Sequence, residues 1–320
     1  MNSARTPQRL RILTWHVHGN YLYYLSQIPH DLYLATDAAR SVHHTGRSGT
    51  LPFGANVHEV RVEEIRHSRF DAVLYQSRDS WDDDRARWLG PEQRALPTLY
   101  IEHDPPQGHP TDTAHWAGQE GTTLVHVTDF NALMWDNGRA RVRVIDHGVK
   151  PLANVPYEGT LPRGIVVVNH LAERGRRLGV DVYERVAGLV PLDLVGMASE
   201  RLGGIGEIDH LELPGFMARR RFYFHPVRYT SLGLALIEAM MAGVPVVGLA
   251  TTELATVIRN GEDGVIDTRV DTLVDAMKRL IEDRGLAQAM GAAGRRRAVE
   301  RFGIERFVAD WNRVLDEAVS

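Results

Sequence analysis

Residues 228–248 read RYTSLGLALIEAMMAGVPVVG, and they decide which fold this chain is expected to adopt. Small polar residues precede a glycine, an apolar run follows, and a Gly-Val-Pro break leads into more valine. This order predicts a loop, a buried helix and a buried strand, since Gly243 is typical of the residue that ends a helix. The apolar run contains one acid, Glu238, which is costly to bury unless another group hydrogen-bonds or neutralises it.

Short apolar runs alternate with helical patterns on both sides of this stretch, which is typical of a parallel sheet covered by helices on both faces. Residues 147–163 lack periodicity and contain several prolines, so we place a domain boundary near residue 155. The strands expected before and after it are Arg11–Trp15, Asp31–Ala35, Ala72–Gln76, Thr98–Glu102, Thr123–Val127 and Val142–Asp146, then Gly164–Asn169, Leu192–Gly196, Phe222–His225, Val244–Gly248 and Gly264–Asp267.

Composition limits the class of protein. The chain has 320 residues, of which 43% are hydrophobic and 24% charged, and a net charge of −4 gives no reason to expect a nucleic-acid partner. No apolar run is long enough to span a bilayer. The absence of cysteine excludes disulfides and thiolate metal sites. We therefore expect a cytoplasmic protein of two domains, with no secretory leader.

The loop before the apolar run is a candidate anion site. A strand that ends at Pro226 and a helix expected over Leu232–Ala242 leave unpaired backbone N–H groups at the helix start, with Thr230 or Ser231 as the N-cap. Glu238 lies one and a half turns into the helix, where it suits the hydroxyls of a ribose better than a phosphate. A solvent-facing or salt-bridged structural role for Glu238 is the alternative.

The run from Phe222 to Gly264 resembles the donor-binding half of the retaining group 1 glycosyltransferases. The family pattern has an acid, a Gly-Phe-Gly-type turn, a helix with a second acid eight residues after the first, and then Gly-x-Pro-Val-Val; this chain has SLGLALIEAMMAGVPVVG. The resemblance implies the GT-B fold, an α/β architecture of two Rossmann-like domains that face each other across a cleft. We expect an acceptor-side domain over 1–155, a nucleotide-sugar-binding domain over 156–302, and a C-terminal helix over 303–320 that packs back on the first domain.

The resemblance also assigns donor-binding residues. It implies that Glu238 holds the ribose of the donor and that the backbone of the turn meets the diphosphate. The turn is Ser231, Leu232, Gly233 and Leu234.

Three positions on the sugar side depart from the family pattern. The first acid falls on Thr230, the Gly-Gly pair on Thr252 and Glu253, and the acid after that pair on Thr256. We expect Glu253 to replace the missing carboxylate as a catalytic residue; the alternative is a solvated glutamate in a loop.

Arg174, Arg176 and Arg177 follow the first strand of the second domain, where the family has basic residues that neutralise the donor diphosphate. A guanidinium forms bidentate contacts with phosphate, so we expect at least one of the three to bind it. Arg228 is a weaker candidate, and a solvated basic turn is the alternative.

The first domain supplies candidate cleft residues from two loops. After its first strand we expect His18, Gly19 and Asn20 at the cleft, with His16 beside them. A metal site built on His16 and His18 would lack a third ligand, so no metal is expected.

The fourth strand of the first domain ends in IEHDPP, which resembles a family motif whose histidine reaches the transferred sugar. This implies a catalytic role for His103, with Asp104 as its orienter or as an acceptor-binding group. A plain turn at the end of a strand is the alternative.

Together these features predict a glycosyltransferase of the hexosyltransferase type. The resemblance implies that it moves a sugar from a nucleotide-sugar donor to an acceptor with retention and without a metal or other cofactor. The acceptor class stays open among a glycan, a lipid-linked glycan and a small molecule. The alternatives are a non-catalytic nucleotide-sugar-binding protein and a nucleotide-sugar epimerase. The basic runs at 219–221 and 295–297 are expected to be solvated helix faces, with peripheral contact at the inner membrane face as the alternative.

Overall fold

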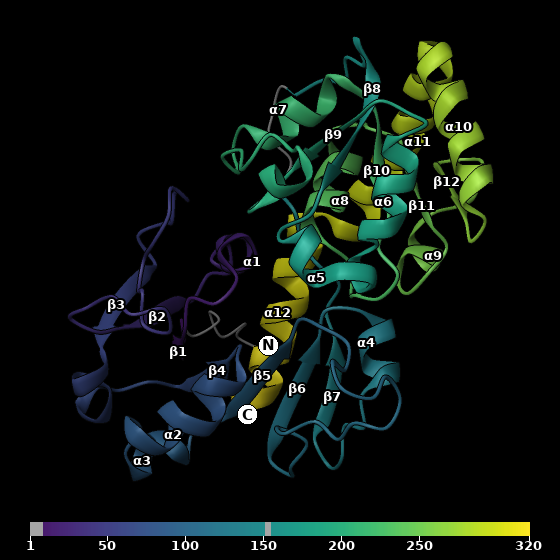
Figure 1. Cartoon of the computed structure of the whole chain (residues 1–320). Coiled ribbons are helices and arrows are strands. Elements are labelled where there is room, and N and C mark those ends of the chain that lie inside the picture. Colours follow the sequence, from purple (N-terminus) through teal and green to yellow (C-terminus); the bar gives the residue numbers. More distant parts are fainter. Residues whose placement is uncertain (1–8, 151–154) are drawn as a thin grey trace, which may run out of the picture. The chain divides into compact units, whose positions relative to one another are not determined.

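The computed structural model describes residues 9–150 and 155–320, and it divides the chain into two compact units (Figure 1). Unit 1 runs to Gly148 and also includes Ile304–Ser320, and unit 2 is Val149–Gly303. Residues 1–8 of the predicted first domain and 151–154 of the predicted linker lie outside the described residues. Among the described residues, no helix combines the length and the apolar character needed to cross a membrane.

Unit 1 is built on a seven-stranded parallel sheet in the order β3-β2-β1-β4-β5-β6-β7. Its central strands are short apolar runs buried on both faces, which is what a parallel sheet covered by helices requires. The order reverses between β1 and β4, which makes the carboxyl ends of these two strands the topological switch point. The strands are β1 (Arg11–Thr14), β2 (Asp31–Thr36), β3 (Val57–Arg61), β4 (Ala72–Tyr75), β5 (Thr98–Glu102), β6 (Thr122–His126) and β7 (Arg141–Val144).

One helix of unit 1 comes from the C-terminal residues of the chain. That helix, α12 (Ile304–Val319), buries Phe307 and Trp311 and packs so closely that a Cβ on Gly148 would lie 2.2 Å from the Cβ of Phe307. Arg143 pairs with Glu317 at 2.7 Å, which ties the far end of α12 to β7. The other helices are α1 (Gly19–Leu25), a 3₁₀ helix (Val62–His67), a π-helical turn (Ser80–Asp84), α2 (Arg85–Arg87), α3 (Pro91–Arg94) and α4 (Asp129–Met134).

Unit 2 is built on a five-stranded parallel sheet in the order β12-β11-β10-β8-β9, so its switch point lies between β8 and β10. The strands are β8 (Leu161–Val167), β9 (Leu192–Val195), β10 (Arg220–His225), β11 (Val246–Leu249) and β12 (Gly264–Asp267). The helices are α5 (Leu171–Leu178), α6 (Val180–Ala187), a 3₁₀ helix (Ser199–Leu202), α7 (Leu213–Ala218), α8 (Leu234–Met241), α9 (Leu254–Val257), α10 (Val270–Glu282) and α11 (Arg284–Phe302).

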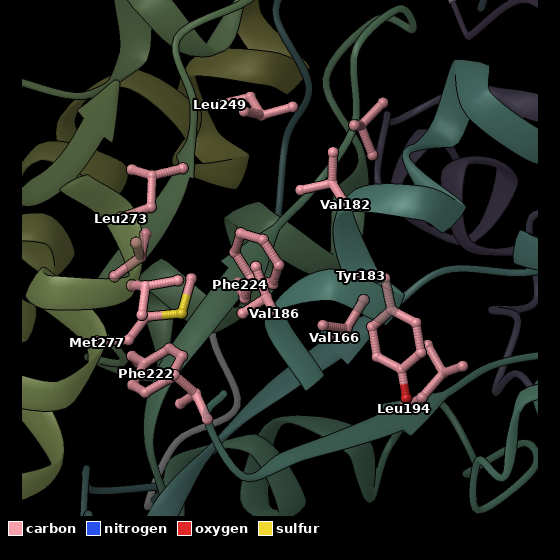
Figure 2. Packing of buried hydrophobic residues seen from close by; sticks show 14 of the residues in the cluster. Val166, Val182, Tyr183, Val186, Leu194, Phe222, Phe224, Leu249, Leu273 and Met277 are labelled. Carbon is pink, nitrogen blue, oxygen red and sulfur yellow. The ribbon is translucent and has the colours of Figure 1, made fainter. Parts of the chain in front are cut away.

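The core of unit 2 gathers side chains from the sheet and from the helices that cover it (Figure 2). Phe222 and Phe224 of β10 are fully buried, with Val186 of α6 and Met277 of α10 in the same cluster. A Cβ on Gly164 of β8 would lie 2.2 Å from the Phe222 ring, so only glycine lets that ring fill the space. This packing lets the middle of β8 and the middle of β10 approach closely.

The predicted fold class is confirmed, whereas several predicted elements are wrong. Residues 171–178, where a basic turn is the alternative for the candidate arginines, form the helix α5; three arginines and an internal glycine hide it, because its buried side is only Leu171 and Leu178. The edge strand β3 was missed because charged residues interrupt its apolar pattern. The basic run at 219–221 is not a solvated helix face: Arg220 begins β10, is 5% exposed and pairs with Asp193 at 2.9 Å.

Candidate functional site

The switch point of unit 2 is formed by α5, which follows β8, and by the loop that follows β10. Gly179 ends α5 with φ 84°, and a Cβ there would lie 2.0 Å from the carbonyl oxygen of Pro226. The backbone N–H groups of Arg228 and Tyr229 donate to the carbonyl oxygen of Arg177 at 3.0 and 3.1 Å. The arginine-bearing helix and the loop are thus bonded into one assembly.

The loop ends in a turn whose backbone N–H groups are open. Helix α8 begins at Leu234, with Gly233 as an N-cap that supplies no side-chain cap, so the predicted start at Leu232 and the predicted cap at Thr230 or Ser231 are wrong. Among the residues that the structure describes, none accepts a hydrogen bond from the N–H groups of Ser231, Leu232, Gly233 or Leu234. Consecutive open N–H groups at a helix start are what an anion site needs.

The four candidate arginines are in different situations. Arg228 makes two hydrogen bonds to Asp181, at 2.6 and 2.8 Å, and these hold the pKa of that carboxyl below its ordinary value. Arg176 pairs with the same carboxylate at 2.6 Å and has a side chain that is 75% exposed. Arg177 has no carboxylate partner anywhere in the described ranges. Arg174 lies half-buried on the first turn of α5. Arg176 and Arg228 are thus already paired with a carboxylate, whereas Arg177 has no such pair among the described residues to give up on meeting a phosphate.

Glu238 is buried in the middle of α8. It is 2% exposed, so the solvent-facing alternative is wrong. Its Oε1 lies 3.6 Å from Nδ1 of His210, and its charge adds to the burial that raises the pKa of Tyr223. Burial lowers the pKa of His210. Sequence reasoning missed His210, because nothing in its segment marks it as a neighbour of α8.

Glu253 has partners that sequence reasoning did not foresee. It is 1% exposed, so it is not a solvated loop residue, and its Oε1 accepts a hydrogen bond from Arg301 of α11 at 2.7 Å. The hydroxyl of Thr256 donates to the same oxygen. These contacts join α9 to α11 and account for the burial of Glu253; its catalytic role stays a prediction. Thr230 lies half-buried at the entrance to the open turn.

The switch point of unit 1 gathers the predicted cleft residues around His103. The His103 ring centroid lies 4.3 Å from that of His18 and 4.6 Å from that of Tyr21, both edge to face. Gly19 and Asn20 form the first turn of α1 and follow His18, which is its N-cap. The loop after β1 and the loop after β5 therefore meet.

The partner that orients His103 is not the predicted one. The side-chain oxygen of Gln76, which follows β4, lies 3.4 Å from Nε2 of His103. Asp104 instead uses its backbone: its N–H donates to the carboxylate of Glu102 at 2.8 Å, and its carbonyl accepts from the Trp135 indole at 2.9 Å. Sequence reasoning missed Gln76 because a single amide at the end of a strand carries no signal of its partner.

His16 is engaged within unit 1. Its Nδ1 lies 2.8 Å from the carbonyl oxygen of Gly46 and 3.1 Å from the hydroxyl of Ser48, which ties β1 to the loop after β2. Across residues 9–150 and 155–320, the structure contains no group of three or more histidine and carboxylate side chains arranged to hold a metal ion.

Two Rossmann-like α/β units on parallel sheets define a GT-B fold, and solved structures share it. A sucrose-phosphate synthase from Thermosynechococcus elongatus is 16% identical with a TM-score of 0.70, over 97% of this chain and 99% of that one. HepE from Anabaena, solved in complex with UDP and glucose, is 13% identical with a TM-score of 0.68, over 96% of this chain and 100% of that one.

Within this fold, residues 198–297 match the family model described as glycosyl transferases group 1. This range contains the open turn, Glu238, His210 and Glu253. The match agrees with the family resemblance for the part of the chain that it covers, most of unit 2.

Curated relatives are similar to parts of the chain. An MMP alpha-(1->4)-mannosyltransferase from Mycolicibacterium hassiacum is 28% identical over 57% of this chain and 45% of its own length. A GDP-mannose-dependent alpha-(1-6)-phosphatidylinositol monomannoside mannosyltransferase from Mycobacterium tuberculosis is 37% identical over 26% of this chain and 24% of its own length. The chain spans less than half the length of these relatives.

Proposed function

We propose that this protein is a glycosyltransferase that takes a sugar from a nucleotide-sugar donor. The observation that carries the proposal is the open turn of Ser231, Leu232, Gly233 and Leu234, which begins the helix that buries Glu238. The turn lies at the switch point of unit 2, where Rossmann-like sheets bind their ligands, and within the range that matches the group 1 family model.

Two parts of the donor, the diphosphate and the ribose, have matching groups in unit 2. The open N–H groups and the Arg177 guanidinium supply positive charge for a diphosphate, while the buried carboxylate of Glu238 accepts hydrogen bonds from ribose hydroxyls. A phosphate binds poorly to a carboxylate, so the order along α8, N–H groups first and acid later, fits a nucleoside diphosphate in one direction only. In unit 1, His103 is assigned to the transferred sugar.

The proposed reaction retains the configuration at the sugar carbon and needs no metal. Charge develops on the diphosphate as it departs, and prearranged N–H groups with a guanidinium stabilise that charge without a cation. The mannosyltransferase relatives make a mannosyl donor the first to test.

Donor turnover and binding test the proposal together. Purified protein is incubated with GDP-mannose, UDP-glucose and dTDP-glucose, with and without EDTA, and nucleoside diphosphate release is measured. We expect turnover of one donor, unchanged by EDTA, and a loss of nucleotide affinity in Glu238→Gln. Asp263→Asn is the matched control, because Asp263 is also a buried acid of unit 2, 4% exposed, and it lies near Arg297 rather than at the turn.

A second candidate function is binding of the nucleotide-sugar without transfer. One observation favours it: Thr230 stands where the family pattern has its first acid. Nucleotide binding that depends on Glu238, with no turnover of any donor in the presence or absence of candidate acceptors, would support this candidate over transfer. A product in which one carbon of the sugar is inverted, with the nucleotide still attached, would point to an epimerase.

A further inference from the structure

The ring of His103 lies where β1, β4 and β5 of unit 1 end, next to His18 and Tyr21. In the part of the chain that the structure describes, its hydrogen-bond partner is Gln76, with 3.4 Å between Nε2 and the amide oxygen. An imidazole nitrogen can donate or accept, depending on which nitrogen carries the hydrogen. The orientation of the Gln76 amide therefore decides which nitrogen that is.

The orientation of Gln76 is fixed from its other side. Its Nε2 lies 3.0 Å from the backbone carbonyl oxygen of Trp15 and 3.1 Å from the hydroxyl of Thr14. A carbonyl oxygen only accepts hydrogen bonds, so the amide nitrogen must face Trp15 and the amide oxygen must face His103. Gln76 is 4% exposed, and a flipped amide would leave two buried oxygens in contact without a hydrogen bond.

An amide oxygen also only accepts, so Nε2 of His103 must carry a hydrogen. The ring is neutral as well, because burial, followed by the charges of His18 and His147, holds the pKa of His103 well below its ordinary value. A neutral ring with its hydrogen on Nε2 has a bare lone pair on Nδ1.

We propose that Gln76 is a positioning residue that holds His103 in the Nε2–H tautomer and so makes Nδ1 the acceptor nitrogen of the ring. A ligand group that meets Nδ1 must donate a hydrogen bond, as a hydroxyl does and a fully ionised phosphate does not. The consequence for a ligand rests on the sugar transfer proposed above. The tautomer itself does not.

Nitrogen-15 NMR of the full chain tests the tautomer directly. Protein labelled at the histidine ring nitrogens gives long-range proton–nitrogen correlations that show which nitrogen of each ring is protonated, and the signals lost in His103→Gln assign His103. We expect a protonated Nε2 and a bare Nδ1 in the wild-type protein near pH 7.5. A protonated Nδ1 would overturn the proposal.

Two variants at position 76 separate the hydrogen bond from packing. Gln76→Leu keeps the volume and removes the acceptor, so we expect a mixture of tautomers or a change to Nδ1–H. Gln76→Glu keeps an acceptor oxygen toward His103, so we expect the Nε2–H form to persist and the pH at which the ring protonates to rise. The titratable side chains beside this ring are His18, Tyr21 and His147.

The matched control is Gln93→Leu. Gln93 is equally buried, 4% exposed, and its amide bonds to the backbone at Gly90, Arg66 and Ser68 rather than to His103. This variant should leave the His103 signals unchanged. An unchanged tautomer in Gln76→Leu, or an Nδ1–H ring in Gln76→Glu, would contradict the proposal. If Gln76→Leu does not fold, the wild-type spectrum and Gln76→Glu still decide.

Transfer assays then connect the tautomer to function. With an active donor, Gln76→Leu should lower kcat more than it raises the donor KM, and Gln76→Glu should shift the pH profile upward. Absence of both nucleotide binding and turnover with every donor in the wild-type protein would remove the proposed function and leave the NMR result standing.

Discussion

Asp181 holds the Arg228 guanidinium through two hydrogen bonds and pairs with Arg176 through the same carboxylate. One acid therefore neutralises two of the four arginines at the switch point of unit 2. Arg177 lies on the same helix without such a partner among the described residues, and its carbonyl oxygen anchors the loop that leads to the open turn. Arg176 of α5 is thus held in a structural ion pair, while Arg177 stays the candidate for the proposed ligand.

This division predicts unequal effects of arginine removal. Arg177→Ala should weaken nucleoside diphosphate binding about 10- to 100-fold, since a hydrogen bond to a charged group contributes about 1.5–3 kcal/mol. Arg176→Ala should change binding by less than about threefold, because that guanidinium is exposed and already paired. Isothermal titration with UDP and GDP measures both variants. Equal losses in both would show that the ion pair with Asp181 does not matter.

The glycines of α5 predict a graded loss of stability. Gly179→Ala puts a Cβ at φ 84° and 2.0 Å from the Pro226 carbonyl, so it should cost more than about 2 kcal/mol. Gly175→Ala also has a positive φ, 59°, but its Cβ meets nothing within 4 Å, so about 1–2 kcal/mol is expected. Gly215→Ala in α7, with open space and no positive φ, is the control and should be neutral or stabilising. Urea unfolding measures all three; a smaller loss for Gly179 than for Gly175 would contradict the packing argument.

The sequence predicted the elements whose pattern is local. Runs such as Thr98–Glu102 and Gly264–Asp267 match the structure to the residue, because a short apolar run specifies a strand without help from the rest of the chain. Helix α5 was missed because its conformation depends on a glycine at φ 59° and on contacts with the loop after β10. A local sequence pattern does not contain information about such contacts.

The residues of the candidate site also differ in whether the sequence alone could identify them. Glu238 was identifiable because an acid in an apolar run is unusual, whereas Gln76 and His210 are ordinary residues that gain importance only from the side chains beside them. The Arg301 partner of Glu253 lies forty-eight positions away on another helix, a distance along the chain that no motif spans. Pairings of this kind become visible only when the chain is folded.

The pairing of Glu253 with Arg301 predicts a test of its role. Glu253→Gln leaves the Arg301 guanidinium without its buried counter-charge and should lower the free energy of unfolding by about 3 kcal/mol. The paired change Glu253→Gln with Arg301→Met should recover part of that loss. Urea unfolding and donor turnover are measured on the same samples. Lost turnover at unchanged stability would instead support the catalytic prediction for Glu253.

Three buried histidines predict loss of stability in acid. Burial lowers the pKa of His115, His126 and His225 to about 4. The unfolded chain, with ordinary values near 6.5, binds more protons than the folded chain between these limits, so stability is full above pH 6.5 and falls as the pH drops toward 4. Each histidine contributes about 3 kcal/mol to that fall at most.

The urea midpoint is measured from pH 4 to 7.5 in the wild type, in His225→Phe and in the control His67→Ala, whose ring is exposed. A pH slope in His225→Phe as steep as in the wild type would contradict this account.

Glu102 predicts the opposite slope at higher pH. Burial raises the pKa of its carboxyl to about 8, so between 4.5 and 8 the folded chain holds the proton more tightly than the unfolded chain. The contribution of Glu102 to stability therefore falls as the pH rises through this interval, by about 4 kcal/mol at most. Glu102→Gln keeps an amide oxygen for the Asp104 N–H and turns its amide nitrogen toward His115, whose Nε2 lies 3.0 Å from the other carboxyl oxygen. The variant is therefore less stable at every pH, but it cannot ionise, so its stability should vary less between pH 6.5 and 9 than that of the wild type. Glu120→Gln is the control, since Glu120 is an exposed acid of the same unit paired with Arg139. Unfolding curves in urea at each pH measure the slopes, and matching slopes in Glu102→Gln and the wild type would show that the carboxylate ionises in the folded protein without cost.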